Sequence, residues 1–109
     1  MDVDKETQEK IQELQAGEQN LQRMVMQKQA FQMELTETEN ALSEISKTNE
    51  EVFKLVGQIM VKTDKNKIQE ELKKKQEILS LRLKSLEKQE SEISKSLENL
   101  KKEVMEKLK

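Results

Sequence analysis

The stretch that decides the fold of this chain is Val52-Phe53-Lys54-Leu55-Val56-Gly57-Gln58-Ile59-Met60-Val61-Lys62-Thr63. Two runs rich in β-branched and other apolar residues flank Gly57-Gln58, and a two-residue loop that begins with glycine is typical of a type II′ turn. The stretch therefore predicts a β-hairpin over residues 52–63, a feature that an ordinary coiled coil does not have.

Strict alternation along the two strands assigns these residues to two faces. One face would carry Val52, Lys54, Val56, Ile59, Val61 and Thr63, and the other Phe53, Leu55, Met60 and Lys62. Both faces are largely apolar, whereas a lone two-stranded hairpin is marginally stable in water. Each of these apolar side chains contributes roughly 1.5 to 3 kcal/mol when it is buried. We therefore expect partner chains to cover the hairpin, through an oligomerisation surface of Val52, Phe53, Leu55, Val56, Ile59, Met60 and Val61.

The composition is typical of long helices. The chain has 109 residues, of which 39% are charged and 33% hydrophobic, with no proline and two glycines. Such a chain is too polar to build a thick globular core. Its net charge of −2 comes from acidic and basic residues that are interspersed, which argues against a nucleic-acid surface over the whole molecule. The lysine clusters at 62–67 and 73–75 are better explained as solvated helix faces with glutamate partners.

The sequence also bears on location. It contains no cysteine, so it offers no disulfide framework and no thiolate chemistry. The N-terminal residues 1–6 lack the apolar centre of a signal peptide. No run approaches the ~18 consecutive apolar residues of a membrane span. We expect a cytoplasmic protein that binds no membrane.

Apolar heptads predict a long helix on each side of the hairpin, over residues 4–46 and 66–108. The first heptad runs through Leu14, Leu21, Leu35 and Leu42, with Met24, Phe31 and Ile45 between them. The second runs through Leu72, Leu79, Leu86, Ile93 and Leu100, with Leu83, Leu97 and Val104 between them. Asp64 or Asn66 would cap the second helix.

An antiparallel pairing of the two helices aligns both heptads when facing residue numbers add to 114. The exceptions in the heptads are then accommodated: Gly17 faces the large Leu97, and Thr38 faces Gln76. Lys28 comes within reach of Glu90, so a slipped register would leave these charges mismatched. The predicted fold is mainly α: one unit over residues 1–109, a long antiparallel two-helix coiled-coil hairpin with one β-hairpin at its connecting end.

The chemistry of the chain argues against an enzyme. There is no histidine, no cysteine, no glycine-rich phosphate loop and no carboxylate spacing of a calcium loop. A two-helix coiled coil also offers no concave site that excludes water. We expect no catalytic residues, no cofactor and no metal.

Several apolar residues have no place in the predicted helix seam or lie at its free ends. At the ends we expect a client-binding surface of Val3, Ile11, Leu14, Leu100, Val104, Met105 and Leu108, because frayed tips expose apolar side chains. Farther in, Val25, Met26, Met33, Ile78 and Leu81 project sideways. Scattered exposed apolar groups are normal, although methionine also suits adaptable binding surfaces.

The hairpin string Val52 to Lys62, between matched helices, resembles the β-class subunits of prefoldin over the whole chain. Three further strings are similar to archaeal members: Gln27-Lys28-Gln29, Glu34-Leu35-Thr36-Glu37, and the second-helix run of Arg82-Leu83 through Leu86-Glu87-Lys88-Gln89-Glu90. A subunit of the α class would carry a second hairpin, for which there is no room here. Phe53 departs from the tyrosine that archaeal members often have, and the C-terminus is short and charged, so client preference stays open.

The resemblance implies a hexamer of two α-class and four β-class subunits, whose hairpins form β-barrels in a platform from which the coiled coils extend like tentacles. It implies ATP-independent capture of non-native polypeptides at the coiled-coil tips and their transfer to a group II chaperonin. The partners would be α-class prefoldin subunits, further copies of this chain, client proteins and the chaperonin.

Two other classes of protein compete with this interpretation. A scaffolding coiled coil would dimerise through its helices and bind no unfolded clients, but it would not need the hairpin. A module for nucleic acid or membrane surfaces would use the lysine clusters and show steep salt dependence. The near-neutral net charge and the two aromatic residues make this the weakest alternative.

Overall fold

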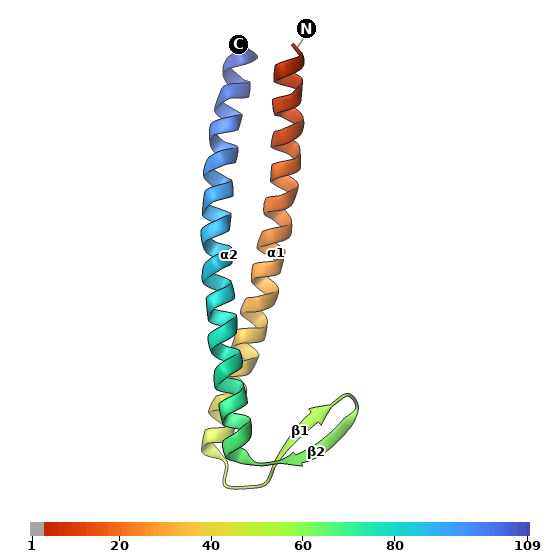
Figure 1. The fold of residues 1–109 in the computed structure, drawn as a ribbon, viewed down its shortest axis with the longest axis vertical. Coiled ribbons are helices and arrows are strands. Elements are labelled where there is room, and N and C mark those ends of the chain that lie inside the picture. Colours follow the sequence, from red (N-terminus) through yellow and green to blue (C-terminus); the bar gives the residue numbers. More distant parts are fainter. Residues whose placement is uncertain (1–3) are drawn as a thin grey trace. The chain divides into compact units, whose positions relative to one another are not determined.

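The structure, a computed structural model, describes residues 4–109. The structure contains two helices of 43 residues, α1 (Lys5–Lys47) and α2 (Lys65–Lys107). Between them in the sequence lies a hairpin of two strands, β1 (Val52–Val56) and β2 (Ile59–Thr63) (Figure 1). The predicted fold of two long helices separated by one antiparallel hairpin is confirmed. Residues 1–3, and with them the predicted tip residue Val3, lie outside the described part.

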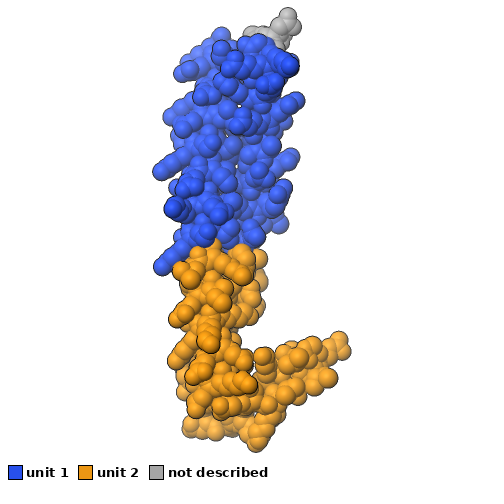
Figure 2. Space-filling view, viewed as in Figure 1, with its two compact units in different colours: residues 1–29, 84–109 blue, residues 30–83 orange. Residues whose placement is uncertain are grey.

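The chain forms two compact units. Unit 1 combines residues 1–29 with 84–109, and unit 2 comprises residues 30–83 (Figure 2). Each unit therefore contains a segment of both helices, which run antiparallel within it, and the hairpin belongs to unit 2.

The hairpin has the register that the sequence predicts. Val56 pairs with Ile59 and the pairing continues outward to Val52 and Thr63, so every facing pair of numbers adds to 115. Gly57 has a φ of +63°, whereas Gln58 has no positive φ. This combination is that of a type II′ turn, and glycine adopts it without steric cost.

Both helices begin after an aspartate. The backbone N–H of Thr7 donates to Oδ1 of Asp4 at 2.7 Å, an N-cap that satisfies one of the free donors in the first turn of α1. This hydrogen bond lowers the pKa of Asp4. In α2 the first backbone bond runs from Ile68 N to Asp64 O at 3.0 Å. Of the two predicted caps, Asp64 precedes the helix and Asn66 lies inside it.

The core of unit 2 lies between its two helix segments. Leu79, Leu83 and Ile68 are buried there, and so is Thr38. The Thr38 hydroxyl donates to the carbonyl oxygen of Glu34 at 2.8 Å, which satisfies a polar group that burial would otherwise penalise. The buried hydroxyl of Thr38 is therefore hydrogen-bonded, and its burial in the seam of unit 2 leaves no unpaired donor.

In unit 1 the two helices pack closely at Gly17. A Cβ atom at Gly17 would overlap with Cδ2 of Leu97, so the absence of a side chain at Gly17 is what admits Leu97. The predicted facing of Gly17 and Leu97 is confirmed, and it fixes the alignment of α1 and α2 within this unit.

The predicted contact between Lys28 and Glu90 is also present in unit 1. Nζ of Lys28 lies 2.9 Å from Oε2 of Glu90, and the two side chains are 32% and 27% exposed. The pair has the distance of an ion pair but not the alignment of a hydrogen bond, and Oε2 has no other hydrogen-bond partner. The short contact with Glu90 raises the pKa of Lys28. Lys28 is thus the group that compensates this buried oxygen.

Replacing Lys28 should therefore destabilise unit 1. We expect Lys28→Leu to lower the melting temperature by a few degrees, because Glu90 is left half-buried without its cation. Lys28→Leu with Glu90→Leu should restore the melting temperature, since two apolar residues suit the seam. Circular dichroism melts check both variants. A single variant as stable as the double variant would contradict the role of Lys28.

The stability that this pair contributes depends on pH, and the direction of that dependence follows from the raised pKa of Lys28. Because folding raises the pKa of Lys28, the stabilisation is complete below the ordinary lysine value of 10.5 and is lost as the pH rises through the raised value. The difference in stability between the wild type and Lys28→Leu should accordingly shrink above pH 10.5.

Candidate functional site

The predicted oligomerisation surface on the hairpin is open to solvent. Val52 is half-buried at the base of β1, and the other six residues, from Phe53 to Val61, are 47–68% exposed. A contiguous exposed apolar patch of this kind marks an interaction site more often than a lone exposed residue does. The patch carries little charge, since Lys54 and Lys62 are the charged residues of the hairpin.

The hairpin backbone is open as well. Its sheet has two strands, so β1 and β2 each pair along one side only. The other side of each strand carries backbone donors and acceptors that a further strand can use. The hairpin can therefore contact other chains in two ways, by strand addition at its edges and by burial of its apolar side chains.

The predicted client-binding residues differ in exposure. Met105 and Leu108 are 56% and 38% exposed, whereas Val104 is 6% exposed and packs in the seam. Ile11, Leu14 and Leu100 are half-buried. Among the predicted residues that the structure describes, Met105 and Leu108 are the ones most available to a ligand.

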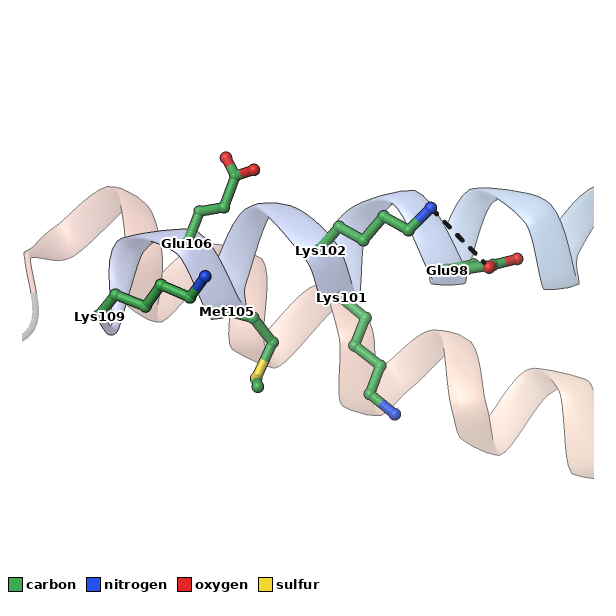
Figure 3. Close-up of a pocket in the computed structure, with 6 residues that line it drawn as sticks. All are labelled: Glu98, Lys101, Lys102, Met105, Glu106 and Lys109. Carbon is green, nitrogen blue, oxygen red and sulfur yellow. Dashed lines mark ion pairs between the residues drawn. The ribbon is translucent and has the colours of Figure 1, made fainter.

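A shallow hollow of about 470 Å³ lies beside Met105 near the end of α2 (Figure 3). Its lining consists of Glu98, Lys101, Lys102, Met105, Glu106 and Lys109. Met105 is the one apolar member, and Lys102 pairs with Glu98 at 4.0 Å. The hollow therefore offers an apolar contact inside a rim of mixed charge. The rim was not predicted from the sequence, although the spacing of four residues from Lys101 to Met105 places these two side chains on one face of α2.

Polar contacts hold the helices together near these residues. Nζ of Lys10 lies 3.3 Å from Oε2 of Glu103 across the seam and 3.5 Å from Oε1 of Glu6. The contact with Glu103 raises the pKa of Lys10. The contact places Lys10, the residue before the predicted tip residue Ile11, beside Glu103. Exposed ion pairs stabilise weakly, and the apolar side chain of Val104 is buried at this end as well.

The sideways residues also lie largely where the sequence predicts them. Met26, Met33, Ile78 and Leu81 are exposed, and Val25 is half-buried. Met33 and Leu81 are each 66% exposed and lie far from the helix ends in sequence. They therefore provide matched controls for the exposed methionine and leucine at positions 105 and 108.

The described residues lack two features that some other classes of protein have. Within residues 4–109, no group of three or more histidine, cysteine, aspartate or glutamate side chains is placed to hold a metal ion. Over the same residues, none of the helices combines the length and the apolar character that crossing a membrane requires.

Comparison with known proteins agrees with the geometry. Residues 8–109 match the family model described as prefoldin subunit. The prefoldin subunit beta of Thermococcus onnurineus is 47% identical over 90 residues, which cover 81% of this chain and 78% of that protein. The prefoldin subunit beta of Saccharolobus islandicus is 34% identical over 105 residues, which cover 94% of this chain and 83% of that protein.

A solved structure extends the likeness to three dimensions. The crystal structure of the prefoldin beta subunit from Thermococcus strain KS-1 matches with a TM-score of 0.86 and 38% sequence identity, over 96% of this chain and 94% of that one. Sequence, helix pairing and single hairpin thus agree over nearly the full length, and the chain belongs to the prefoldin family as a subunit of the beta class.

Proposed function

We propose that this chain is a subunit of an ATP-independent chaperone that captures non-native polypeptides at the ends of its helices and delivers them to a group II chaperonin. Membership of the prefoldin family supports a chaperone role and assembly with other prefoldin subunits. In our proposal the assembly is a hexamer of two α-class subunits and four copies of this chain, located in the cytoplasm.

The observation that carries the proposal is the exposed hairpin surface. Six apolar side chains, from Phe53 to Val61, stand in solvent on a two-stranded sheet with open edges. Burial of part of this surface against hairpins of other subunits would provide the stability that an isolated hairpin does not have. A barrel formed from such hairpins would also remove the open edges.

Client capture would use the exposed ends of the helices. Met105 offers a flexible apolar contact that adapts to unrelated sequences, and Leu108 adds a second exposed apolar side chain. One such end would bind weakly. Several ends in one assembly would add their contacts through effective concentration, so a non-native chain is held without any tight single site.

The test is suppression of aggregation by the assembled protein in the absence of nucleotide. A denatured client is diluted into buffer with the complex of this chain and an α-class subunit, and light scattering is followed. We expect scattering to fall with increasing complex, because bound clients are removed from the aggregating pool. A coiled coil that acts as a scaffold would leave the scattering unchanged, and that result would reject the proposal.

A further inference from the structure

The hairpin has one ion pair to a helix among the residues that the structure describes. Nζ of Lys54 in β1 lies 3.2 Å from Oε2 of Glu71 in α2, and the two side chains are 49% and 46% exposed. The other charged residue of the hairpin, Lys62, pairs at 3.1 Å with Glu51, which immediately precedes β1. Lys54 therefore ties the hairpin to α2, whereas Lys62 ties the hairpin to its own entry segment.

A second observation shows which face of the hairpin turns toward the helices. Val52 and Thr63 are the two half-buried residues of the strands, and they form a facing pair at the hairpin base. Strand alternation places both on the same face as Lys54. Burial at the base and the ion pair farther along thus identify the same side, which we call the Lys54 face: Val52, Lys54, Val56, Ile59, Val61 and Thr63.

The opposite side, the Phe53 face, consists of Phe53, Leu55, Met60 and Lys62. Leu55 and Met60 form a facing pair on it, and each is 68% exposed. Its three apolar residues lie close to one another without an intervening charge, and Lys62 is occupied by Glu51. This face therefore presents three apolar side chains beside one lysine, and it points away from the side held by Glu71.

We infer that the Lys54–Glu71 pair positions the hairpin, holding the Lys54 face toward α2 and presenting the Phe53 face to the hairpin of another prefoldin subunit. The partner that fits the Phe53 face is an apolar sheet face, because three of its four side chains are apolar and exposed, and Lys62 already pairs with Glu51. Lys54 and Glu71 are positioning residues: they select the direction of the hairpin and do not themselves form the subunit contact. The choice of face rests on the proposed assembly through hairpins, whereas the positioning does not.

The positioning is tested on the full-length chain by pulsed electron resonance between two spin labels. The chain lacks cysteine, so Gln58→Cys in the turn and Glu77→Cys in α2 provide the only attachment sites. Dilution with unlabelled chain removes distances between molecules. We compare Lys54→Glu, Glu71→Lys and the reversed pair with both changes. Lys62→Glu is the matched control, because it breaks the other hairpin ion pair.

We expect one narrow distance distribution for the wild type and for Lys62→Glu. Lys54→Glu and Glu71→Lys should each broaden it, with the dominant orientation losing up to about fivefold in relative population, as befits a half-exposed pair. High salt should broaden the wild-type distribution in the same direction. The reversed pair should restore the narrow distribution. A single variant that matches the wild type, or a reversed pair as broad as the single variants, would overturn the positioning role.

The choice of face is tested separately in the assembled complex. Leu55→Cys on the Phe53 face and Ile59→Cys on the Lys54 face report at two positions that are each 68% exposed in the chain alone. We expect assembly with an α-class subunit to slow alkylation of Leu55→Cys at least about tenfold more than that of Ile59→Cys. Equal protection, or greater protection of Ile59→Cys, would overturn the assignment. A wild-type chain that does not assemble would instead reject the proposed function, and the spin-label result would still decide the positioning.

Discussion

We expect Phe53→Asp together with Met60→Asp to abolish assembly with other prefoldin subunits and to leave both helices intact. The two residues are 48% and 68% exposed in the chain alone, so aspartate is tolerated there. In an interface each carboxylate would be desolvated without a partner, at a cost of several kcal/mol. Since about 1.4 kcal/mol is a factor of ten, the affinity should fall by at least about 1,000-fold.

Native mass spectrometry and circular dichroism measure the two parts of this expectation. Met33→Asp with Leu81→Asp is the control, because it places the same charges at similarly exposed apolar positions outside the hairpin. The control should assemble as the wild type does. Complexes of unchanged mass with Phe53→Asp and Met60→Asp would show that the hairpin is not the subunit contact.

We expect Met105→Gln with Leu108→Gln to weaken client capture by about 10- to 100-fold without affecting assembly. Each exposed apolar side chain can contribute on the order of 1 kcal/mol to a client contact, so the loss of both at one helix end removes about 2 kcal/mol, or about 30-fold in affinity. Both residues are exposed, so the variant should keep the helicity of the wild type. Val104 is left unchanged because it is buried in the seam.

Suppression of aggregation, titrated with the assembled complex, measures this effect. Met33→Gln with Leu81→Gln provides a control with the same residue types, both more exposed than Met105 and Leu108 and away from the helix ends. The control complex should suppress aggregation at the same concentration as the wild-type complex does. Equal protection by both variants would show that clients do not bind through Met105 and Leu108.

The hairpin was predictable because its determinants are local. Gly57 marks the turn, and alternation on either side of it defines the register from Val52 to Thr63. The pairing of the helices was predictable for a different reason. Its exceptions are complementary, so the facing of Gly17 with Leu97 and the contact of Lys28 with Glu90 follow from one alignment of the heptads.

Other features leave no such pattern in the sequence. The pair of Lys54 and Glu71 joins residues 17 apart in different elements, and its formation depends on the direction of the hairpin. Val104 and Met105 are neighbours in sequence, yet one is buried and the other exposed, because successive helix positions point about 100° apart. The division into two units near residues 29 and 84 likewise has no glycine or proline to mark it.

The central claim is that this chain assembles with other prefoldin subunits through its hairpin. Native mass spectrometry of the chain, with and without an α-class prefoldin subunit, tests it most directly. We predict a complex that contains four copies of this chain and two of the α-class subunit. A stable dimer of this chain that ignores the α-class subunit would contradict the claim and favour a scaffolding coiled coil.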